Sequence, residues 1–145
     1  MREGEAALEL RTPGRAEVVL RDAEGREFRL VWEGDGHRRR PLPAQGYVLL
    51  SYRIWRGPFL VSGSGKLHRF ALAPGEVLPL HLPARVRLDL RVISVGASAR
   101  ILLQARGPFR YGASVYREGR RIPLPYRYLN HRGEEAARGG VLDYG

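Results

Sequence analysis

Apolar and polar residues alternate along most of this chain, in short runs separated by turn residues. In the run ARVRLDLRVI at positions 84–93, Val86, Leu88, Leu90 and Val92 fall on one face, while charged side chains fall on the other. A period of two is the pattern of a β-strand that is half buried in an antiparallel sheet. No run has the period of a helix. The alternation therefore predicts an all-β fold, with the apolar face of this strand buried.

The same alternation predicts several further strands. In the run REFRLVWE at 26–33, Phe28, Leu30 and Trp32 share a face. Additional strands are expected in the runs ARILLQA, GASVYRE and PLPYRYLN, at 99–105, 112–118 and 123–130.

The run GYVLLSYRIW at 46–55 differs because both of its faces are apolar. Strict alternation places Val48, Leu50, Tyr52 and Ile54 on one face. It places on the other face Tyr47, Leu49 and Trp55. The run therefore predicts a central strand that is covered on both sides, or one that bends between two sheets.

Glycine and proline mark the turns between these runs. The chain contains 18 Gly and 10 Pro, spread along its whole length. The runs RDAEGREF at 21–28 and LNHRGEEA at 129–136 have the loop length of β-hairpins. Together these signals predict a single antiparallel β-sandwich of about eight to nine strands that spans residues 1–145. The proline-bounded segments 76–82 and 122–129 are the expected edge strands.

The C-terminal part of the chain, residues 111–145, contains three consecutive motifs: SVYREGRR, IPLPYRYLNHRGEE and AARGGVLDYG. This order of strand, acidic-Gly-basic turn, proline segment and hairpin resembles bacterial transthyretin-like (prealbumin-like) and immunoglobulin-like modules. The run PLPAQGYVLLSYRI at 41–54 is similar to the strand entry of such modules. The resemblance implies a β-sandwich of one of these two types, and it implies a binding, spacer or envelope-associated role without catalysis. The ending LDYG and the absence of the matching histidine pattern separate the chain from transthyretin-related hydrolases.

Residues that could catalyse a reaction or bind a metal are scattered along the sequence. The chain has no cysteine, and its histidines are His37, His68, His81 and His131. None of them has the spacing of a metal site on one element. Asp89 lies between Arg87 and Arg91 on one strand face, where the arginines favour the ionised carboxylate, the opposite of a general acid. We therefore expect no enzyme activity, no metal and no cofactor.

The charge of the chain is strongly basic, at +10, and Lys66 is the only lysine among 25 basic residues. A GC-rich coding bias and a thermophile-like composition explain this preference for arginine without a function. The alternative is a basic surface that binds nucleic acid, an acidic polymer or a lipid surface. The candidate residues are Arg38, Arg39, Arg40, Arg53, Arg56, Arg85, Arg87 and Arg91. Alternation places Tyr47, Arg53 and Trp55 on one face and Tyr52 opposite, which counts against one aromatic and basic nucleic-acid groove.

These observations predict a non-catalytic interaction or structural module of a bacterial assembly. The expected partner is another protein or an anionic polymer, and nucleic acid is less favoured. A homodimer, and a small hydrolase, stay open as alternatives. Neither a signal peptide nor a membrane-spanning run is visible. The expected location is the envelope or the exterior if a leader has been removed, and the cytoplasm otherwise.

Overall fold

The computed structural model describes residues 4–36, 38–82, 86–107 and 112–142, and it is built from β-strands and turns. The strands are β1 (Glu5–Leu10), β2 (Ala16–Asp22), β3 (Glu27–Trp32), β4 (Arg39–Pro43), β5 (Gly46–Arg56), β6 (Phe59–Ala71), β7 (Val77–Leu80), β8 (Arg87–Val95), β9 (Ser98–Arg106), β10 (Ser114–Arg117), β11 (Arg120–Arg121), β12 (Leu124–Leu129) and β13 (Glu135–Leu142). These thirteen strands of the described residues outnumber the eight or nine predicted. Short strands such as β11, with two residues, are too short to show alternation.

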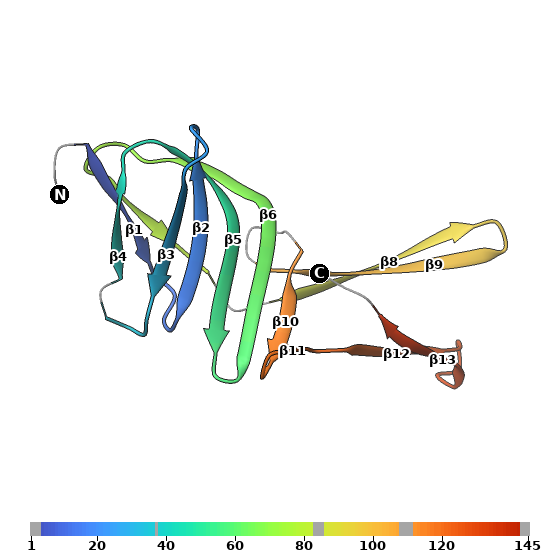
Figure 1. Ribbon diagram of the computed structural model, residues 1–145. Helices are drawn as coiled ribbons and strands as arrows, with labels where there is room; N and C mark the ends of the chain where they lie inside the picture. The colour runs from blue at the N-terminus through green and yellow to red at the C-terminus, as the bar shows by residue number, and fades with distance from the viewer. Residues whose placement is uncertain (1–3, 37, 83–85, 108–111, 143–145) are drawn as a thin grey trace.

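Two sheets pack face to face and enclose the core (Figure 1). The larger sheet has six strands in the order β11-β10-β6-β5-β2-β3, and the smaller has three in the order β4-β1-β7. Most neighbours are antiparallel, as predicted, but β1 and β7 are parallel. The all-β fold with several antiparallel sheets is therefore confirmed. The predicted edge position of the segment 76–82 is also confirmed, because β7 ends the smaller sheet.

The alternating residues of β1, β2 and β3 supply the core between these sheets. Leu8 of β1, Val18 of β2 and Trp32 of β3 are each at most 1% exposed. The indole nitrogen of Trp32 donates a hydrogen bond to the backbone oxygen of Arg38, 2.7 Å away, so burial leaves no unpaired indole donor. Leu30 is also buried and Phe28 packs against the cluster, which confirms the face predicted for this strand.

The central strand β5 contains a β-bulge, and the bulge overturns the faces that strict alternation predicted. The register against β6 shifts between Leu49 and Ser51. A bulge inserts one residue and reverses which side chains point inward beyond it. The buried set is therefore Tyr47, Leu49, Tyr52 and Ile54, drawn from both predicted faces. The position of β5 in the middle of its sheet is as predicted, since β2 and β6 flank it.

Two hairpins, β8–β9 and β12–β13, extend away from the packed sheets (Figure 1). Each hairpin forms a sheet of only two strands. The prediction that Leu88, Leu90 and Val92 are buried is wrong, because these side chains are 51%, 60% and 59% exposed. The strand itself is confirmed as β8, but among the described residues no second sheet covers its apolar face.

Tyr52 connects the sandwich to the segment that follows the β8–β9 hairpin. Its side chain is 1% exposed, and burial raises its pKa to about 12. The ring lies against Gly63 of β6, while the hydroxyl lies against Gly107, just beyond the end of β9. Both glycines leave the space that the ring occupies, so the close approach depends on the absence of a Cβ atom.

Candidate binding surfaces

The first of the three consecutive arginines, Arg38, is used inside the fold. The three nitrogens of its guanidinium donate hydrogen bonds to four backbone carbonyl oxygens, those of Leu10, Thr12, Gly14 and Gly34. The distances are 3.2 Å from Nε to the oxygen of Leu10 and 3.1 Å from Nη1 to that of Gly14. These oxygens belong to the end of β1, the β1–β2 connection and the turn after β3. Arg38 therefore joins the β1–β2 connection to the turn after β3.

Arg39 and Arg40 are the first two residues of β4. The Nε of Arg39 lies 2.9 Å from a carboxylate oxygen of Glu9 on the neighbouring strand β1. The Nε of Arg40 donates to the backbone oxygen of Val31 at 2.8 Å. The run of three arginines therefore serves mainly to join β3, β4 and β1, and its donors face protein oxygens.

The other predicted arginines occupy separate places in the fold. Arg53 and Arg56 lie on β5, and both are exposed. Arg87 and Arg91 lie on β8 of the projecting hairpin and are exposed. The remaining candidate, Arg85, lies outside the described residues. The structure does not bring the Arg38–Arg40 run and the β8 arginines together into one basic surface in the part of the chain that it describes.

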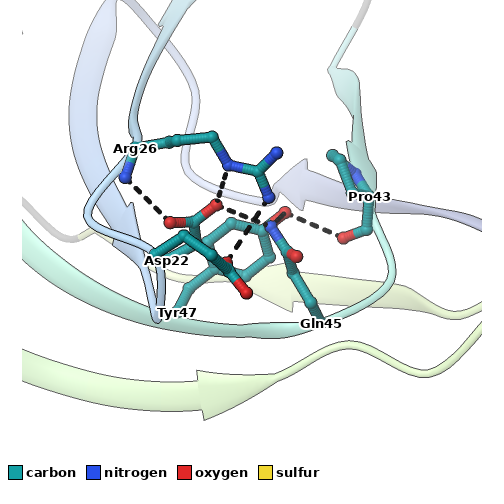
Figure 2. Close-up of polar contacts among 6 residues, drawn as sticks. Asp22, Arg26, Pro43, Gln45 and Tyr47 are labelled. Carbon is teal, nitrogen blue, oxygen red and sulfur yellow. Dashed lines mark hydrogen bonds and ion pairs between the residues drawn. The ribbon is translucent and has the colours of Figure 1, made fainter.

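A buried carboxylate organises the turn between β2 and β3 (Figure 2). Asp22 accepts hydrogen bonds from the backbone nitrogen of Arg26 at 2.8 Å, from its Nε at 2.6 Å, and from Gln45 at 3.1 Å. Gln45 also contacts the hydroxyl of Tyr47, which donates to the backbone oxygen of Pro43. Burial by itself raises the pKa of Asp22, but the hydrogen bonds from Arg26 outweigh it, and the pKa lies below the ordinary value of 3.8.

The free energy of unfolding is expected to decrease as the pH falls below about 4. Since the pKa of Asp22 is lower in the folded protein, its stabilising contribution is complete above the ordinary value and is lost as the pH falls through the folded pKa. Urea unfolding of wild type and Asp22→Asn should show a stability difference that shrinks toward acid pH. The control is Glu24→Gln, an exposed carboxylate of the same turn, whose difference from wild type should not follow this trend. A wild-type advantage over Asp22→Asn that stays constant to about pH 2 would contradict the role of this carboxylate.

A groove of about 910 Å³ lies on the outer face of the six-stranded sheet. Its lining comes from β2, β3, β5, β6 and β10 and includes four serines, Ser51, Ser62, Ser64 and Ser114. Charged side chains also line it: Glu17, Glu27, Arg29 and Arg53. Hydrogen-bonding and charged side chains therefore dominate this surface, in contrast to the apolar face of the β8–β9 hairpin.

The carboxylates of this groove are already paired. Glu17 lies 2.8 Å from the guanidinium of Arg29, and Glu27 lies 2.6 Å from that of Arg21. Asp89 on β8 is likewise paired, at 2.9 Å from the Nε of Arg106. The sequence had placed Asp89 beside Arg87 and Arg91, but Arg106, its diagonal neighbour on β9, pairs with it instead.

The described histidines are spread over the molecule. His68 lies on β6 and stacks on Phe70, while His81 and His131 are exposed, and His37 lies outside the described residues. No group of three His, Asp or Glu side chains in the described part of the chain could hold a metal ion. The same residues contain no helix that could cross a membrane.

No protein-family model, curated protein or solved structure matches the chain.

Proposed function

We propose that this chain is a non-catalytic interaction module that assembles through the β8–β9 hairpin. The observation that carries this proposal is the exposure of Leu88, Leu90 and Val92, each more than half accessible on one face of β8. Apolar side chains gathered on one exposed face mark an interaction site in a folded protein. A hairpin of two strands is also marginally stable by itself, so a partner that covers this face stabilises the hairpin. We also propose that the sandwich is of the immunoglobulin-like or transthyretin-like type, which the resemblance of residues 111–145 implies.

The partner we favour is a second copy of the chain. Arg87, Asp89 and Arg91 alternate with the apolar residues and lie on the opposite face of β8. When two apolar faces stack against each other, these charged side chains lie outside the interface, and two basic chains can approach. The contact is self-complementary, as a two-fold dimer requires. It is also small, so we expect a dimer that depends on concentration.

An anionic polymer is the alternative partner, and it would use the opposite face of the hairpin. The exposed Arg87 and Arg91 lie there. The dependence on salt distinguishes the two partners. Stacking of apolar faces between two chains of charge +10 should strengthen as salt screens their repulsion. Binding of a polyanion should weaken steeply as salt rises.

Leu90→Asp is expected to abolish the dimer, because it places a charge in the centre of the apolar face. Sedimentation equilibrium over a range of protein concentrations should show association of the wild type and a monomer for the variant. The matched control is Arg91→Asp, which introduces the same carboxylate one residue away on the opposite face and should leave the dimer intact. Circular dichroism of both variants checks that the sandwich remains folded.

Two outcomes would overturn this proposal. The first is a wild type that stays monomeric at every concentration and salt. The second is an equal response of Leu90→Asp and Arg91→Asp, which would mean that the face of the hairpin does not matter. Binding of heparin that disappears in Arg91→Asp, together with a monomeric wild type, would assign the hairpin to the anionic polymer instead.

A further inference from the structure

We propose that the groove on the outer face of the six-stranded sheet binds an oligosaccharide that carries a carboxylate, and that Arg53 anchors this carboxylate. The groove lies on the sandwich and not on the β8–β9 hairpin, so the inference stands independently of the dimer. It rests on three features of the groove: the order of its side chains across the strands, the pairing of its charges and the ring of Tyr116.

Hydrogen-bonding side chains form a row that crosses four strands. Glu17 on β2 is the register partner of Arg53 on β5, Arg53 is the partner of Ser62 on β6, and Ser62 is the partner of Ser114 on β10. Neighbouring strands are about 4.8 Å apart. This spacing is close to the repeat of an extended chain of pyranose rings. A second, shorter row of hydroxyls beside it is formed by Ser51 and Ser64.

Among the residues that the structure describes, Arg53 is the charged residue of the groove lining that forms no ion pair. Glu17 is paired with Arg29 and Glu27 with Arg21. The exposed Arg53 forms no side-chain hydrogen bond or ion pair with any residue that the structure describes. A guanidinium offers two parallel donors that match the two oxygens of a carboxylate. A single guanidinium without an ion pair fits a ligand with a carboxylate at one position.

Tyr116 adds an apolar surface next to this row. It lines the groove and follows Ser114 by two residues on β10, so both side chains lie on the same face. Its register partner on β6 is Leu60, which is half buried, and the partner of Leu60 is Trp55. Sugar rings have polar edges and an apolar face, and a hydroxyl row beside an aromatic ring complements both.

The same features disfavour a nucleic acid as the ligand. A single strand carries a phosphate at every nucleotide and requires a groove with an excess of positive charge along its length. Here Glu17 and Glu27 line the groove together with the arginines. They would repel successive phosphates, whereas they can accept hydrogen bonds from sugar hydroxyls.

Isothermal titration calorimetry of the intact chain tests this inference. The probes are sialyllactose and glucuronosyl-xylobiose, which each carry a single carboxylate, and each is compared with its methyl ester, which lacks the charge. We expect at least one acid to bind, and its ester to bind at least about tenfold more weakly, the loss expected for one charge-assisted pair. Arg53→Gln should lower the affinity for the acid to that for the ester. Ser62→Ala should weaken the acid and the ester alike, because it removes a hydroxyl and no charge.

The matched control is Arg56→Gln, on the same strand with the same change of charge but outside the lining of the groove. It should leave the affinity for the acid unchanged. The inference is overturned if no acid binds up to millimolar concentration, or if Arg53→Gln and Arg56→Gln weaken binding equally. It is also overturned if a dT oligonucleotide binds in an Arg53-dependent manner more tightly than every saccharide.

Discussion

Gly63→Ala should destabilise the protein by about 2–3 kcal/mol, because the site has no space for a methyl group. An added Cβ would lie 2.6 Å from Cε1 of Tyr52 and 2.8 Å from its Cζ. The ring cannot withdraw, since the side chain is buried between the sheets and its hydroxyl lies against Gly107. Strand β6 or the ring must therefore shift, and the packing around Tyr52 is lost.

Gly46→Ala is the matched control for this substitution. Gly46 lies at the start of β5, and an added Cβ there meets no atom within 4 Å. Its effect on the free energy of unfolding should be small, and a gain is expected because alanine restricts the unfolded chain. Denaturant unfolding of the two variants measures the difference. Equal stabilities for Gly63→Ala and Gly46→Ala would show that Tyr52 does not occupy the space beside Gly63.

Arg38→Met should destabilise the protein by about 3 kcal/mol, since several carbonyl oxygens lose a charged donor at once. Methionine keeps most of the aliphatic stem, so the loss reflects the guanidinium. The oxygens of Leu10, Thr12, Gly14 and Gly34 would then have to find water or remain unpaired. We expect the β1–β2 connection and the turn after β3 to separate, which amide hydrogen exchange would detect as faster exchange there.

Arg39→Met makes the same chemical change at the neighbouring position and serves as the control. Arg39 is 65% exposed and pairs with Glu9, and such surface pairs contribute about 1 kcal/mol or less. Arg39→Met should therefore lower the free energy of unfolding far less than Arg38→Met does. Similar losses for Arg38→Met and Arg39→Met would contradict the assignment of Arg38 as the residue that joins the two loops.

Alternation predicted the strands well and the burial of two of them poorly. For β3, the expected inward set of Phe28, Leu30 and Trp32 is confirmed, because no bulge interrupts its pairing with β2. For β5, the bulge between Leu49 and Ser51 changes the inward face part-way along the strand. A bulge depends on how two strands pair, and a single run of residues carries no mark of it.

The eight candidate arginines show the same limit. The sequence grouped the Arg38–Arg40 run with the other arginines because all are basic, but the tertiary structure gives Arg38 four backbone oxygens as partners, three of them from the distant segment 10–14. The sequence predicted Arg53 only as one member of a basic binding surface, and its placement in the groove follows from its register with Glu17 and Ser62. The serines of the groove were not predicted, since Ser62 and Ser114 are far apart in the chain and meet only across β6 and β10.

The sequence by itself determined that this protein is all-β, where the hairpin turns at 21–28 and 129–136 lie and which strand is central, because alternation and turn residues are properties of neighbours in the chain. The tertiary structure decided which faces are buried, which arginines serve the fold and which residues meet in the groove. These outcomes depend on register between strands that are distant in sequence. The apolar face of β8 shows the difference clearly: its alternation is that of a half-buried strand, yet Leu88, Leu90 and Val92 are exposed because no sheet of the described chain covers them.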